Sequence, residues 1–193
     1  MPGGWTMSAF WLPMCGQSWL AAMAGFARMW ALTMVPMMLP LAVAPLRRYR
    51  ATLDGTGRWR PFLLTVAAGL AWAAAWMASG APLYLVGTAV AQALPGLPAL
   101  ARMMPVLAAA AGVAGAGWHV ASWWRHPLHA PRAEAGPPVC AAALLHGARL
   151  GGHCVRRCAG LSVALLAAGI METGTMVCAI AVVAVESVCL RDR

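Results

Sequence analysis

The stretch AAMAGFARMWALTMVPMMLPLAVAPL, residues 21–46, carries a single charged residue, Arg28. At a helical rise of about 1.5 Å per residue, it is long enough to cross a hydrocarbon core roughly 30 Å thick. Pro36 and Pro40 lie inside it, and neighbouring helices in a membrane can satisfy the carbonyl groups that a proline frees. The stretch therefore predicts a transmembrane helix.

The composition of the whole chain agrees with this interpretation. Of its 193 residues, 62% are hydrophobic and only 10% are charged, and its mean hydropathy is +0.71. Soluble domains carry roughly 25% charged residues, because a compact particle in water needs a polar surface. We therefore expect a single integral membrane domain over residues 1–193, with the lipid bilayer as its main partner.

Further apolar stretches predict an all-α, polytopic bundle of about five transmembrane spans. The predicted spans cover residues 21–46, 61–79, 101–124, 158–171 and 175–190. Residues 80–98 are ambiguous, since the apolar part is short and ends in the helix breakers PGLP, and we interpret them as a bent or surface-lying helix. Residues 1–20 are uncharged and rich in Trp, which favours the membrane interface. They predict an interfacial N-terminal arm.

The arginines predict the orientation in the membrane. All fourteen basic residues are Arg, and twelve of them fall in the expected loops 47–60 and 125–157 and in the tail 191–193. Basic residues of short loops stay on the cytoplasmic side, so we expect a multi-pass inner-membrane protein with its N-terminus outside and its C-terminus cytoplasmic. This placement also explains the net charge of +9 without nucleic acid as a partner.

Three methionines of the first span follow a helical spacing. Met34, Met37 and Met38 stand at i, i+3 and i+4 and share one helical face. Thioether sulfur is a soft ligand that suits cuprous copper. The alternative is that Met serves as adaptable filler in an irregular helix.

The segment HGARLGGHCVRRC, residues 146–158, holds a second group of candidate ligands. Cys154 and Cys158 stand at i and i+4, His153 is adjacent, and His146 lies about two turns earlier. Thiolate and imidazole together can bind copper or zinc. The two intervening arginines favour the thiolate but repel a cation, and small apolar cysteines at the start of a helix are the alternative.

Two glutamates lie within or beside the last two spans. Ionisable groups in a membrane are costly and often functional, so Glu172 and Glu186 are candidates for a metal pathway. A role in capping a helix end, or an ion pair of Glu186 with Arg191, is the alternative. Cys178 is expected to pack in the core.

The sequence offers no support for an enzyme. It contains no phosphate-binding glycine loop, no HExxH, no G-x-S-x-G and no carboxylates paired at catalytic spacing.

Several segments together resemble the bacterial predicted metal-binding integral membrane proteins of domain of unknown function 2182. The similar segments are WTMSAFWLPMCGQSWLAAMAGFARMWALTMVPMMLP (5–40), LPALARMMPV (97–106), GWHVASWWRHPL (117–128), GARLGGHCVRRCAGL (147–161) and GIME (169–172). The resemblance implies a divergent member, with Arg157–Cys158 where the family tends to have Cys-Cys and Ala130–Pro131 near an expected cysteine pair. Some members are named as copper chaperones. The resemblance implies metal handling by Met37, Met38, His153, Cys154, Cys158, Glu172 and Glu186.

We therefore expect a membrane protein that binds or passes a soft metal ion, copper or else zinc, with a metal-handling protein as a potential partner. A non-catalytic membrane scaffold or assembly partner is the second hypothesis. A small-solute transporter is the third, and it is the weakest because the spans offer few polar residues to line a pathway.

Overall fold

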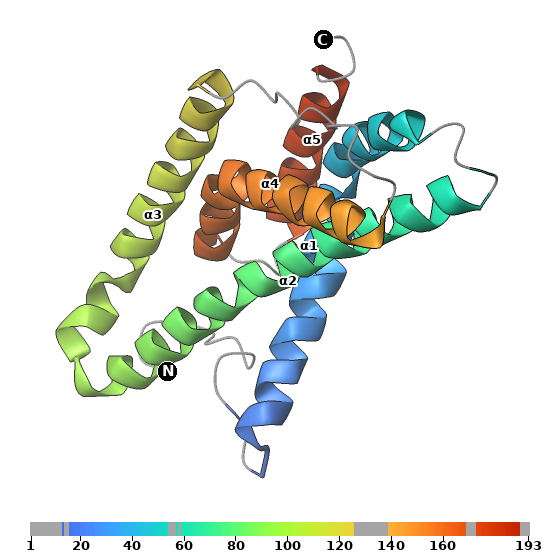
Figure 1. Ribbon diagram of the computed structural model, residues 1–193. Helices are drawn as coiled ribbons and strands as arrows, with labels where there is room; N and C mark the ends of the chain where they lie inside the picture. Colours follow the sequence, from blue (N-terminus) through green and yellow to red (C-terminus); the bar gives the residue numbers. More distant parts are fainter. Residues whose placement is uncertain are drawn as a thin grey trace.

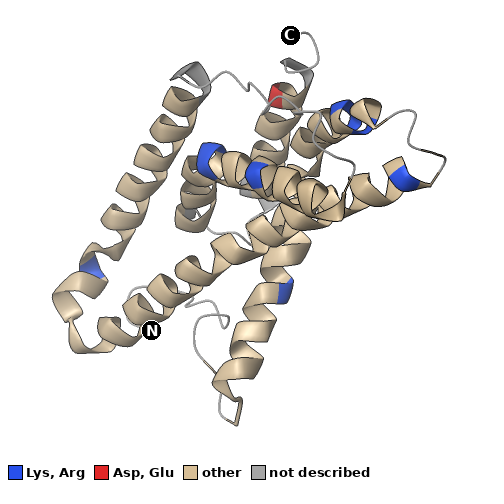
Figure 2. Cartoon of the chain, viewed as in Figure 1, with Lys and Arg blue, Asp and Glu red and all other residues tan. Residues whose placement is uncertain are grey.

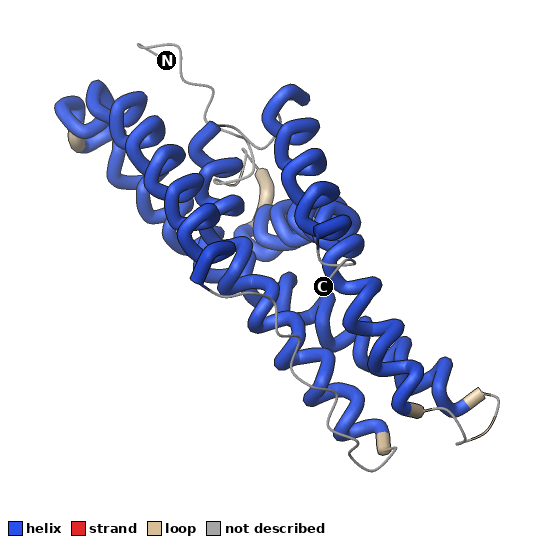
Figure 3. The backbone as a smooth tube through the Cα atoms, turned by 90° about the horizontal axis from the view of Figure 1, so that it is seen from above, coloured by secondary structure: helices blue, strands red, loops and turns tan. Residues whose placement is uncertain are grey.

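The computed structural model describes residues 13, 16–53, 57, 59–125, 139–168 and 173–189, and in this part of the chain it is helical without any strand. Figure 3 shows helical tube along almost all of the described backbone, with only short loops between helices. The prediction of an all-α fold is confirmed for these residues. The interfacial arm lies mostly outside them, and Trp19 is instead the first residue of a helix.

Helix α1 (Trp19–Thr52) contains the apolar stretch and extends beyond it. The side chain of Ser18 caps its N-terminus by accepting a hydrogen bond from the N–H of Ala21. The helix continues through three prolines and includes Arg47, Arg48 and Arg50. The prediction of a loop at 47–60 is therefore wrong over its first part, since these arginines lie in the last turns of α1. Tyr49 in the same turns is buried against the rest of the protein.

Helix α2 (Arg60–Ala93) is longer than predicted. The interpretation of residues 80–98 as a separate bent or surface-lying helix is wrong, because α2 passes Gly80 and Pro82 unbroken. Gly80 lets the indole of Trp30 pack on the α2 backbone, where a Cβ would lie 2.8 Å from Trp30 Cδ1. The helix-breaking sequence PGLP (95–98) instead follows the end of α2, at the 3-10 turn η1 (Leu94–Gly96).

Helix α3 (Pro98–Arg125) matches the expected third span closely, and so does α5 (Thr173–Cys189) for the last one. Helix α4 (Cys140–Ala168) begins far earlier than the predicted span at 158. The expected loop 125–157 is therefore wrong from residue 140 onward. The arginines on α4 had indicated a loop, but Arg149 and Arg156 are exposed on a helix whose other face is buried.

Helix α4 occupies the centre of the packing. It contacts α2 and α3 most extensively, α1 packs on α2, and α5 contacts both α1 and α4; Figure 1 shows α4 lying across α2. Close approach is possible because Gly147 and Gly151 of α4 touch the α2 backbone at Ala68 and Trp72. On its other side, Gly160 of α4 lies against Gly115 of α3.

The exterior of the described chain is largely apolar. Three helical stretches are long and apolar enough to cross a membrane, namely Trp19–Thr52, Arg60–Gly96 and Pro98–Ser122, and a shorter apolar helix covers Met176–Ser187. Five spans are thus not confirmed. Figure 2 shows most basic residues at the end of α1, the start of α2 and along α4, with single ones elsewhere on α1 and α3.

Candidate functional site

One buried cluster brings the methionine face of α1 together with the cysteine pair of α4. The cluster also includes Trp30 of α1 and Trp72 and Trp76 of α2. It lies where α1 and α4 meet the middle of α2, so residues far apart in the sequence share one apolar interior. Both sulfur-rich motifs therefore lie in the same buried cluster.

The three methionines are buried as their spacing predicts. Met34 and Met38 are 0% exposed and Met37 is 8% exposed. Two other methionines of the helices, Met23 and Met103, are largely exposed. Burial is thus specific to the i, i+3, i+4 face rather than a property of every Met in the chain.

The two thiols lie together in the same interior. Cys158 is 0% exposed, Cys154 is buried, and the two residues stand one helical turn apart on α4. Trp72 and Trp76 lie in the same cluster, and neither buried indole N–H has a hydrogen-bond partner within the described residues. Buried N–H donors beside a sulfur would stabilise negative charge on it, as hydrogen bonds to metal ligands do.

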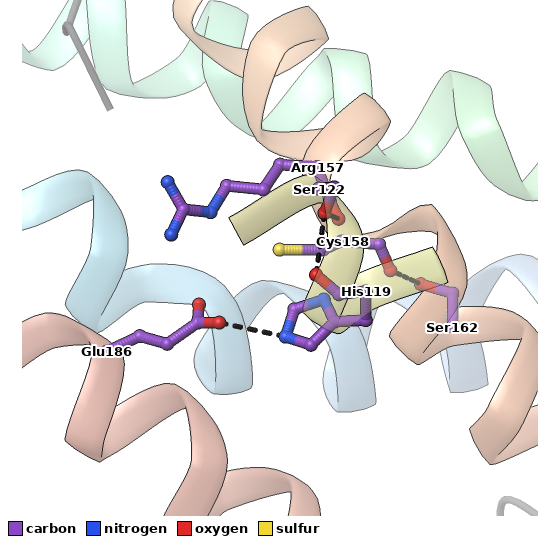
Figure 4. Close-up of polar contacts among 6 residues, drawn as sticks. All are labelled: His119, Ser122, Arg157, Cys158, Ser162 and Glu186. Atoms are coloured by element: carbon purple, nitrogen blue, oxygen red, sulfur yellow. Dashed lines mark hydrogen bonds and ion pairs between the residues drawn. The ribbon is translucent and has the colours of Figure 1, made fainter. Parts of the chain in front are cut away.

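A buried polar group lies next to Cys158, between α3 and α5. Nε2 of His119 is 2.8 Å from Oε1 of Glu186, and both side chains are buried. Figure 4 shows the sulfur of Cys158 pointing toward the space between the Arg157 guanidinium and the Glu186 carboxylate. The alternative pairing of Glu186 with Arg191 stays untested, because Arg191 lies outside the described residues.

Sequence reasoning missed His119 and Arg157 as members of the site. His119 stands inside the otherwise apolar helix α3, and an ionisable residue within such a helix is a functional candidate in its own right. That signal was present in the sequence. Its partner could not be found there, because the contact depends on how α3 and α5 are rotated about their axes.

Backbone contacts fix the turn of α4 that carries Cys158. The hydroxyl of Ser122 on α3 donates to the carbonyl of Arg157 at 3.3 Å, and the hydroxyl of Ser162 donates to the carbonyl of Cys158 at 3.2 Å. The contact of Gly160 with Gly115 lies less than a turn away. The position of the thiol is therefore set by a rigid helix–helix contact.

Other predicted ligands lie elsewhere. His153 is exposed, on a different face of α4 from the thiols. His146 stacks on the ring of Tyr49, with centroids 4.5 Å apart, and packs beside a second small core that contains Ala143. Glu172 falls outside the described residues. Cys178 is exposed, so the expectation that it packs in the core is wrong.

The ligand types in the cluster favour a soft ion. Within the described ranges, no three His, Cys, Asp or Glu side chains gather closely enough to hold one metal ion. A structural zinc site needs four such ligands in a tetrahedron. Two thiols in a buried cluster that also contains three thioethers are a ligand set that suits a cuprous ion, which accepts sulfur ligands at low coordination.

Comparison with known families agrees with this chemistry. The sequence model of the copper chaperone family PpoB2 matches residues 27–193, which include the three methionines of α1 and the two cysteines of α4. The chain belongs to the PpoB2 copper chaperone family. The copper-related part of the resemblance is thereby confirmed, and a non-catalytic role agrees with the family description. No curated protein and no solved structure matches the chain.

Proposed function

We propose that this chain is an integral membrane copper chaperone that holds a cuprous ion on the thiolates of Cys154 and Cys158. Thioether sulfur from the Met34, Met37 and Met38 face of α1 completes the ligand set. The ion is cargo, which the protein receives and passes to a metal-handling partner. Membership of a copper chaperone family supports the metal, and the apolar helices support the membrane location.

One observation carries the proposal. The methionine face and the cysteine pair, which come from distant parts of the sequence, are buried in the same cluster. Sulfur in a buried apolar interior suits cuprous copper, because thiolate and thioether are soft ligands that favour this ion over harder ones. A non-catalytic scaffold would use the same residues for packing alone and would not bind copper.

The topology is part of the same proposal. We place the N-terminus outside and the C-terminus in the cytoplasm of the inner membrane, since the arginines beside the α1–α2 connection and on α4 then stay on one side. We also infer that the chain is a divergent member of its family, with Arg157 in place of a cysteine.

Anaerobic titration of the full chain in detergent with cuprous ion, against a colorimetric chelator, tests the copper site. We expect one tightly bound ion in the unaltered protein and loss of that binding in the Cys154→Ser/Cys158→Ser variant. Cys140→Ser/Cys178→Ser is the matched control, because both of these thiols are exposed, and it should bind as the unaltered protein does. Equal binding by both double variants would exclude the proposed ligands.

A further inference from the structure

Arg157 is a buried arginine next to a proposed copper ligand. It is 7% exposed, whereas the neighbouring Arg156 is exposed. Burying a charged group is costly unless another charge or a hydrogen-bond network compensates it. Figure 4 shows the guanidinium of Arg157 beside Cys158, where its positive charge can stabilise negative charge on the sulfur.

Glu186 brings the opposite charge to the same thiol. It is 5% exposed and is the only acidic residue that the structure describes. Its contact with His119 holds the carboxylate near Cys158 from the α5 side. The Cys158 sulfur points between the guanidinium of Arg157 and the carboxylate of Glu186 in Figure 4, so the two charges act on it in opposite directions.

The chemistry of loading determines the sign of each effect. Two thiols that bind one cuprous ion form two copper–sulfur bonds and release two protons to solvent. Two thiolates and one monovalent cation leave a net charge of −1 in the apolar interior. A nearby positive charge stabilises this complex and a nearby negative charge destabilises it.

We infer that Arg157 is the counter-charge of the loaded copper site and that Glu186 opposes it. The two are positioning residues that act through Cys158 and set the affinity for copper between them. This inference rests on the proposed function. In this inference Glu186 weakens copper binding, whereas a Glu186 that served as a copper ligand would strengthen it.

Titration of two Arg157 variants with cuprous ion tests whether Arg157 stabilises the loaded site. Arg157→Gln should weaken binding on the order of ten- to hundredfold, the usual cost of losing a group that supports metal ligands. Arg157→Lys should retain most of the affinity because it keeps the charge. Arg156→Gln removes the adjacent but exposed arginine and should bind as the unaltered protein does.

Glu186→Gln tests whether the negative charge of Glu186 weakens copper binding, and it distinguishes this electrostatic effect from a loss of folding. It keeps an oxygen that can contact His119 but removes the negative charge, so we expect severalfold tighter copper binding. A variant that failed to fold could not bind more tightly. The double variant Arg157→Gln/Glu186→Gln should return toward the affinity of the unaltered protein, because the two charges are removed together.

The outcomes distinguish the two proposals. Unaltered protein that binds no copper would remove the proposed function and this inference together. Copper binding that is unchanged in Arg157→Gln, or weakened by Glu186→Gln, would overturn the inference alone and leave the cysteine site standing.

Discussion

At the scale of single residues, the site depends on the difference between thioether and hydrocarbon. Met34 and Met38 fill space that Leu could also fill, since both are fully enclosed by apolar neighbours. Exchanges between Met and Leu conserve volume and usually cost less than about 1.5 kcal/mol. Of these two side chains, only Met carries a sulfur atom that can bind copper. The free energy of unfolding and the copper affinity should therefore respond differently to the same substitution.

Met34→Leu/Met38→Leu should therefore lower cuprous affinity while lowering the free energy of unfolding by no more than about 3 kcal/mol for the pair. Cuprous titration and thermal unfolding in detergent measure the two quantities. Met23→Leu/Met103→Leu is the control, because both residues are exposed on helices, and it should change neither. Unaltered affinity in the buried pair would reduce these methionines to packing residues.

At the scale of helices, α4 positions the thiols through its glycines. A Cβ at Gly147 would collide with the carbonyl of Ala68 on α2, whereas a Cβ at Gly152 would meet nothing within 4 Å. The two glycines lie on the same helix, so they experience the same helix propensity but different packing. Close backbone contact of this kind is a common way for helices to associate in lipid.

Gly147→Ala should destabilise the fold by about 1–3 kcal/mol through overpacking. Gly152→Ala should instead stabilise it by about 0.5–1 kcal/mol, because alanine favours a helix and has room there. Thermal unfolding of the two variants in the same detergent measures the difference. Equal shifts, or a more stable Gly147→Ala, would contradict the close contact between α4 and α2.

The helices also show how far the sequence alone could predict the fold. Apolar length predicted α3 and α5 well, but charge was a poor guide to where α4 begins, since Arg149 and Arg156 lie on an exposed helical face. The short apolar segment before PGLP suggested a separate bent helix, but α2 continues without a break to Ala93 and packs Gly80 against Trp30. Local signals therefore located helices but misplaced ends that tertiary contacts determine.

For the candidate site, spacing predicted which residues share a face but not which faces meet. The i, i+3, i+4 methionines and the i, i+4 cysteines were identifiable from the sequence, and both groups are buried. Their inclusion in one cluster, and the approach of His119 and Glu186, depend on the rotation of each helix. His153 shows the opposite case, since a neighbour in sequence points away from the thiols.

At the scale of the whole molecule, the fold brings a candidate metal-binding motif from each half of the chain into one apolar cluster. Helix α1 contributes thioethers and α4 contributes thiols, while α2 supplies the tryptophans between them. Helices α3 and α5 contribute one buried polar contact beside the thiols, between His119 and Glu186. The account therefore requires copper to be bound by sulfur from both ends of the chain.

X-ray absorption at the copper edge, on the full chain loaded with one cuprous ion, tests this requirement most directly. We predict a first coordination shell of sulfur alone, which loses sulfur scatterers in both Cys154→Ser/Cys158→Ser and Met34→Leu/Met38→Leu. A first shell dominated by nitrogen or oxygen would contradict the account and place the ion on other residues, such as the histidines.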